Sequence, residues 1–124
     1  MAVSIVDIAS PAGLKKYHDT DIGATKVSID ATSGNIHAIV IDNTANAAEA
    51  TFLKLWNVAS GSVTVGTTAP DYVFMVPAAT KVTIVFNSAI AYDTALTVAC
   101  VTTAGTAGTT DPTASVVLDL IFET

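Results

Sequence analysis

The chain contains no arginine, since its five basic residues are all lysines, and eleven acidic residues bring the formal net charge to −6. Arginine makes the bidentate contacts by which most nucleic-acid modules hold phosphates and bases, and an acidic surface is repelled by a phosphate backbone. Residues of either charge account for 13% of the sequence, about half the usual share. We therefore predict no nucleic-acid partner, and a surface that is permanently covered in part by other protein.

Cysteine is almost absent as well. The single cysteine, Cys100, excludes an intramolecular disulfide, and its place in an apolar run predicts a small buried side chain. The N-terminus lacks the charged start and apolar run of a secretory signal, and no uninterrupted apolar stretch approaches the length of a membrane span. The sequence predicts a protein made in a cytosol and without membrane contact.

With only two histidines, candidates for catalysis or metal binding are few. His37 stands in an apolar run, where a hydrogen-bonded, half-buried histidine is expected. His18 is followed by Asp19 and Asp21, but the rest of a calcium loop is missing, so a solvated turn is expected. Three other aspartates stand at turns, where carboxylates commonly accept hydrogen bonds from backbone amides: Asp71, Asp93 and Asp111. We predict no enzyme activity, no cofactor and no metal site.

The abundant residues favour β-sheet, with 21 Ala, 15 Val and 19 Thr. From residue 24 on, short β-prone runs alternate with turn clusters, without helical periodicity. The expected strands are 24–29, 35–42, 51–58, 72–76, 80–86, 94–103 and 115–122. We predict one all-β domain over residues 23–124, an antiparallel sandwich or jelly roll of about seven to eight strands. The small polar residues of 102–113 indicate a long flexible loop.

The run 51–58 holds the only tryptophan. Read with period two, Phe52 and Trp56 share one face with Lys54, while Leu53 and Leu55 lie on the other face. Both faces are partly apolar, so each must be covered, by a second layer of the same chain or by a neighbouring copy. We expect Phe52 and Trp56 in the core, and the face of Leu53 and Leu55 is one of two candidates for an interface between copies. The other expected core residues are Val82, Ile84, Phe86, Leu96, Val98, Leu118 and Leu120.

The last strand also has surplus apolar surface. Beside its core face, Val117 and Ile121 flank Asp119 on the second face. This second face is the other candidate for the interface between copies, and we expect a stable oligomer, most simply a homotrimer, through one of the two.

Residues 1–22 form a separate compositional unit. Val3 and Ile5 lie in a short apolar strand, and Lys15 and Lys16 lie in a polar, turn-rich segment after a proline break. We predict an N-terminal arm whose strand adds to a neighbour's sheet or packs back on its own chain, with both possibilities open. Deletion of residues 2–20 is then expected to leave the sandwich folded.

Several short motifs follow one another between residues 50 and 122. They are an aromatic Leu-Lys-Leu strand at 52–57, a Val-Gly-Thr turn before a proline at 65–70, a Pro-Ala bend at 77–78, a Gly/Ala/Thr/Asp loop at 105–111 and a final apolar strand from 116. This ordered series resembles that of small β-sandwich virion proteins of tailed bacteriophages. The chain departs from it at Ala79 and Thr80, which replace a glycine-rich bend, and at 87–92, which lacks a glycine pair and an arginine.

The resemblance implies a structural component of the virus particle, most simply a trimeric decoration, or cement, protein. Such a protein is made in the host bacterial cytoplasm, binds the major capsid protein on the outer capsid surface and stabilises the head. The arm residues Val3, Ile5, Lys15 and Lys16 would then reach toward the shell or an adjacent copy.

The alternative is a tail or fibre module that binds a receptor or a carbohydrate. Exposed tyrosines stack on sugar rings, and Tyr72 and Tyr92 stand at the edges of loops. Packing at strand ends is the commoner role of such tyrosines.

Overall fold

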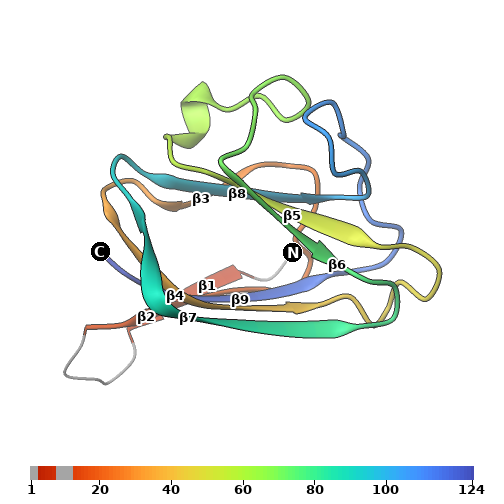
Figure 1. The fold of residues 1–124 in the computed structure, drawn as a ribbon, viewed down its shortest axis with the longest axis horizontal. Coiled ribbons are helices and arrows are strands. Elements are labelled where there is room, and N and C mark those ends of the chain that lie inside the picture. The colour runs from red at the N-terminus through yellow and green to blue at the C-terminus, as the bar shows by residue number, and fades with distance from the viewer. Residues whose placement is uncertain (1–2, 8–12) are drawn as a thin grey trace.

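Nine strands form two antiparallel sheets in the structure, a computed structural model that describes residues 3–7 and 13–124. The five-stranded sheet has the order β1-β2-β9-β4-β7, and the four-stranded sheet has the order β3-β8-β5-β6 (Figure 1). The strands are β1 (Val3–Asp7), β2 (Lys15–Asp19), β3 (Val27–Asp30), β4 (Gly34–Asp42), β5 (Thr51–Trp56), β6 (Tyr72–Val76), β7 (Lys81–Tyr92), β8 (Leu96–Val101) and β9 (Val117–Glu123), with a short 3-10 turn, η1 (Ser60–Ser62), after β5. The predicted all-β sandwich is confirmed.

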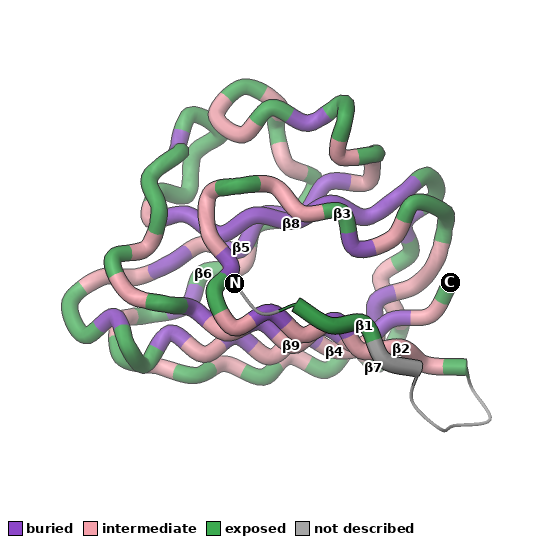
Figure 2. Tube along the Cα trace, turned by 180° about the vertical axis from the view of Figure 1, so that it is seen from behind, coloured by how far each residue is buried: buried purple, intermediate pink, exposed green. Residues whose placement is uncertain are grey.

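The main core lies between the two sheets. On β9 the alternation expected of a half-buried strand is confirmed, because Leu118, Leu120 and Phe122 are buried. Strand β8 is buried along its whole length and includes Cys100, whose pKa is raised to about 12 by burial. Figure 2 shows the buried segments concentrated on β8, β5 and the facing strands of the larger sheet.

The two faces of β5 are the reverse of the prediction. Leu53 and Leu55 are buried in the main core, so the prediction that these two residues form an interface between copies is wrong. Phe52 is half-buried, and Trp56 lies outside the main core in a second cluster with Val63 and Ala99. Both faces are covered by the same chain, which is why this strand is apolar on both sides.

That second cluster lies under a cap, which we define as residues 57–71 and 102–112. The indole Nε1 of Trp56 donates to the carbonyl of Thr68 at 3.0 Å, and the two halves of the cap meet where Gly66, at φ +95°, packs against Thr109. Only glycine fits there, because an added Cβ would collide with the Thr109 side chain and would need a left-handed backbone. The cap forms the loop layer above β5 and β8 in Figure 1.

Lys54 is fully buried beneath this cap. Its Nζ donates to the carbonyl oxygens of Gly105 at 2.7 Å and Gly108 at 3.2 Å. Desolvation lowers the pKa of the ammonium group. The 102–113 segment, expected as a flexible loop, is therefore tied to the sheet by two backbone carbonyls that accept from a buried ammonium group.

Strand β2 was not predicted, and it moves the domain boundary. It pairs with β9 inside the five-stranded sheet, and Tyr17 and Ile22 belong to the main core. The Tyr17 hydroxyl donates to buried Asp19 at 2.9 Å, and burial together with that bond raises the pKa of Tyr17. The larger sheet thus includes both β1 and β2, and the predicted boundary between an arm of residues 1–22 and the sandwich is wrong. The strand from Val3 packs back on its own chain, as the partner of β2.

Strand β7 extends beyond its predicted end at residue 86, and its pairing with β4 contains an irregularity. Val85 pairs with Ala38 of β4, whereas the next paired residue of β7 is Ile90, opposite Ile36. Between these pairs β7 uses more residues than β4 does, as in a β-bulge, which bends a strand. The bend turns the end of β7 up toward the other sheet (Figure 1).

A tight turn joins β6 to β7, and it places Ala79 at φ +54°. The turn is held by the neighbouring 42–50 loop, since the carbonyl of Asn46 accepts from the Ala79 amide at 2.9 Å and buried Asn43 donates to the carbonyl of Pro77 at 3.1 Å. A left-handed conformation costs an L-residue about 1 to 2 kcal/mol.

Replacement of Ala79 by glycine is expected to raise the free energy of unfolding by about 0.5 to 1 kcal/mol, because the relief of backbone strain exceeds the added chain entropy of glycine. Urea unfolding measures the change. Ala78→Gly is the matched control in the same turn, where φ is not positive, and it should destabilise. Equal shifts in the two variants would contradict the argument.

Candidate interaction surfaces

The outer face of the five-stranded sheet, the side turned away from the core, carries no second layer in the described chain. Its middle is apolar, because Val85, Ala38 and Ile121 are cross-strand neighbours on β7, β4 and β9. Val85 is 70% exposed, and Val117 and Ile121 are half-buried. The placement of Val117 and Ile121 on the second face of β9 agrees with the sequence pattern, and their role in an interface stays a prediction.

The charged groups of this outer face pair with each other. Asp119 Oδ1 lies 2.6 Å from His18 Nδ1 and 3.3 Å from Lys16 Nζ. His37 Nε2 lies 3.0 Å from Glu123 Oε1, in agreement with the hydrogen-bonded role predicted for this histidine. His18 lies on a strand, so the solvated turn predicted for it is wrong. Such exposed pairs add little stability, but they leave the face with few unpaired charges.

A second surface is the open side of the sandwich, where β6 and β7 are the edge strands of their sheets. Three side chains that point between the sheets form a row, which we call the aromatic row: Tyr72, Phe74 and Phe86. Tyr72 stacks on Phe74 with ring centroids 6.5 Å apart, and Phe74 meets Phe86 at 6.1 Å. Tyr72 remains 44% exposed at the mouth of this row.

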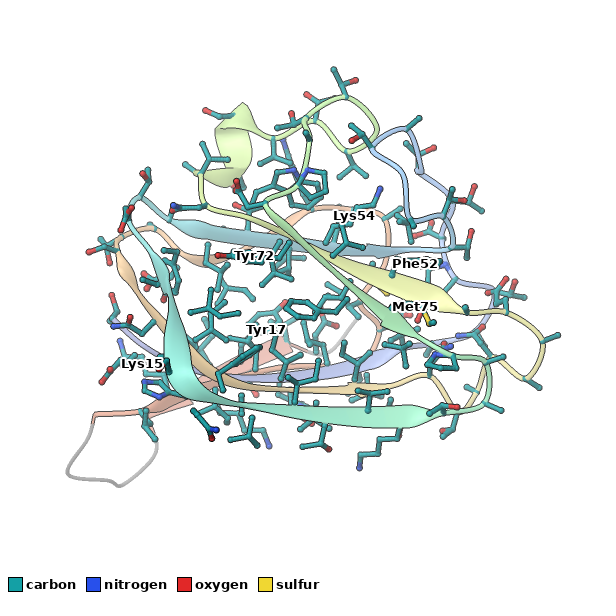
Figure 3. All side chains as sticks on the ribbon, in the orientation of Figure 1. Lys15, Tyr17, Phe52, Lys54, Tyr72 and Met75 are labelled. Atoms are coloured by element: carbon teal, nitrogen blue, oxygen red, sulfur yellow. The ribbon has the colours of Figure 1, made fainter. Side chains whose placement is uncertain are left out.

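The other face of β6 is apolar and exposed too. Val73 and Met75 point away from the core, and Met75 lies beside half-buried Phe52 of β5 (Figure 3). These two residues and Val85 were absent from the predicted interface. The sequence of β6, Tyr-Val-Phe-Met-Val, is apolar on both faces, which is the signal that could have identified Val73 and Met75.

The third surface is β1, the opposite edge of the larger sheet. Val3 and Ile5 face the same side as buried Asp19 and Tyr17, their partners on β2. They are nevertheless exposed, Ile5 by 51%, since the four-stranded sheet does not extend over β1. Of the two arm lysines, Lys16 lies on the outer face beside Asp119, and half-buried Lys15 pairs in register with Phe122.

The second tyrosine proposed for sugar stacking is unsuited to it. Tyr92 is buried, and its hydroxyl donates to Asp30 at 2.7 Å beneath Gly34, where an added Cβ would collide with the ring. Burial opposes ionisation of Asp30, but the hydrogen bonds from Tyr92 and Thr32 outweigh it and lower the pKa of Asp30. Burial and the same carboxylate raise the pKa of Tyr92. This group is therefore part of the structural frame.

Two turn aspartates have the predicted role. Asp71 accepts from the Asn57 amide at 2.6 Å, and Asp111 accepts from the Ala24 amide at 2.6 Å. Within residues 3–7 and 13–124, no three or more His, Cys, Asp or Glu side chains are grouped so that they could hold a metal ion. The same residues contain no helix of the length and apolarity needed to cross a membrane. Comparison with protein-family models, curated proteins and solved structures finds no match for this chain.

Proposed function

We propose that this protein is a non-enzymatic structural component of a bacteriophage particle, a decoration protein that binds the outer capsid surface and stabilises the head. The proposal rests on the resemblance of residues 50–122 to small virion proteins, together with the three apolar surfaces. The partners it implies are further copies of the chain, most simply as a homotrimer, and the major capsid protein.

The observation that best supports it is the uncovered outer face of the five-stranded sheet. Its apolar middle, with Ile121 and Val85, is bordered by carboxylates already paired to His18, His37 and Lys16. A partner that covers this face removes apolar area from water and leaves few charges unpaired, the condition for a favourable contact. A protein that binds only the assembled shell opposes its disassembly by mass action.

One observation supports the alternative of a fibre module. Tyr72 is exposed and held flat by Phe74, and a fixed tyrosine ring is a suitable platform for a sugar. One ring without neighbouring polar groups that converge on a ligand is a weak site, so we keep the decoration role as the main proposal.

Particle reconstruction with copy counting tests the function. We expect hundreds of copies on the outside of the head, and heads without the protein should lose their contents at lower temperature or milder osmotic shock. Ile121→Asp should weaken head binding, while Thr64→Asp, on the exposed cap, should not. A location on the tail, a few dozen copies, or equal survival of bare heads would refute the role.

A further inference from the structure

The large apolar side chains that are exposed in the described chain gather at two opposite edges of the molecule. Val3 and Ile5 lie on β1, and the others lie on β6 and β7: Tyr72, Val73, Met75 and Val85. Strands β1 and β7 are the two ends of the same five-stranded sheet. In Figure 1, β6 and β7 face the viewer, and in Figure 2, turned by 180°, β1 does.

The two edges have complementary shapes. At one end the larger sheet extends past the smaller one, so that the core-facing side of β1 has no cover over Val3 and Ile5. At the other end, Phe74 of β6 reaches Phe86 of β7, and Tyr72 closes the mouth while still exposed. The first edge lacks a covering layer, and the second lacks a neighbouring strand.

The backbone is complementary in the same way. Among the described strands β1 pairs only with β2, and β7 pairs only with β4, so each presents a free row of amide and carbonyl groups. Such edges pair readily with another strand. The first paired segment of β7 runs from Lys81 to Val85, which matches the five residues of β1.

We propose that β1 of one copy docks along the free edge of β7 in the next copy, with Val3 and Ile5 against the aromatic row. The contact, which we call the edge joint, continues the five-stranded sheet from copy to copy and covers Val3, Ile5 and Tyr72 at once. Because it joins two different surfaces it is head-to-tail, and a rotation that closes after three copies gives the trimer. The occupant is a second copy because one chain carries both halves of the joint.

The edge joint rests on the proposed function, and it identifies the residues through which the copies of the decoration protein contact one another. It leaves the outer face, with Val117 and Ile121, for the capsid shell. Its test uses the isolated protein, so failure of the joint and failure of head binding are seen separately.

Two variants break the joint from its two sides. Ile5→Asp changes the β1 side, and Tyr72→Asp changes the β7 side; both residues are exposed in the single chain, so the fold should survive, as circular dichroism checks. Each variant buries an unpaired carboxylate in the joint and is expected to weaken self-association by about a hundredfold or more. Met75→Asp is the matched control, since it places the same charge on the opposite face of β6.

Sedimentation from micromolar to millimolar concentration gives the readout. We expect trimers for the natural chain and for Met75→Asp, and monomers of 12.6 kDa for the two joint variants. In a mixture, Ile5→Asp keeps an intact β7 side and Tyr72→Asp keeps an intact β1 side. The mixture should therefore form a one-to-one dimer that grows no further, which only a head-to-tail contact predicts.

A monomeric natural chain throughout this range would overturn the edge joint. So would trimers that persist in both joint variants, or trimers lost equally in Met75→Asp. A mixture that stays monomeric would overturn the head-to-tail arrangement. Dissociation of the trimer by Ile121→Asp alone would transfer the contact between copies to the outer face.

Discussion

Deletion of residues 2–20 is expected to unfold the protein. The deletion removes β2, which pairs with β9 in the interior of the larger sheet, and with it Tyr17, which is buried in the core. Loss of one buried aromatic side chain alone costs about 3 to 5 kcal/mol, and a domain of this size is stable by only about 5 to 15 kcal/mol. The expected far-ultraviolet spectrum is that of a disordered chain, or the product is insoluble.

The control deletion removes residues 2–7 only. It takes away β1, whose described side chains are exposed, and leaves β2 paired with β9. This shorter protein should keep a cooperative unfolding transition within about 2 kcal/mol of the intact chain, because few buried apolar contacts are lost. It should also lose self-association through the edge joint. A folded, soluble protein after the longer deletion would show that β2 is dispensable, as the sequence alone suggested.

Trp56→Ala is expected to lower the free energy of unfolding by about 3 to 5 kcal/mol. The indole fills the second cluster under the cap, against Val63 and Ala99, and its Nε1 holds the carbonyl of Thr68. Its removal leaves a cavity between the sheet and the 57–71 loop. We expect proteases to cut this loop faster in the variant, and urea unfolding to measure the loss of stability.

Two substitutions on β5 calibrate this result. Trp56→Phe keeps an aromatic ring but loses the bond to Thr68 and the second ring of the indole, so it should cost less than Trp56→Ala, about 1 to 3 kcal/mol. Phe52 lies on the same face of β5 as Trp56 but outside the second cluster. Because Phe52 is only half-buried, Phe52→Ala should lower the free energy of unfolding by less than Trp56→Ala does. An unfolding midpoint for Trp56→Ala equal to that of the natural chain would refute the role of the indole in holding the cap.

Much of the frame follows from local patterns. The alternation of Leu118, Leu120 and Phe122 with partly polar neighbours identifies the core face of β9, because only one register buries all three side chains. The apolar surroundings of Cys100 are enough to predict its burial. Aspartates that accept the amide two residues on, as Asp30 and Asp42 do from Thr32 and Thr44, follow from turn chemistry.

Other assignments were beyond a local pattern. In β2 the sequence Lys-Lys-Tyr-His-Asp offers a single large apolar side chain, so its strand is stabilised by pairing with β9 and by the fit of Tyr17 into the core. The burial of Lys54 depends on carbonyls of Gly105 and Gly108, about fifty residues away in the chain. The residues next to Lys54 in the sequence do not predict hydrogen-bond partners at such a separation.

The sequence by itself determined that β5 is a strand with two apolar faces, because period-two alternation is a property of the extended backbone. Which face meets the other sheet was decided only by the tertiary structure. Each side carries two large apolar residues, Leu53 and Leu55 on one and Phe52 and Trp56 on the other, so local alternation does not rank them. The choice depends on what long-range packing brings to each side: the larger sheet covers the leucines, and the cap covers the tryptophan.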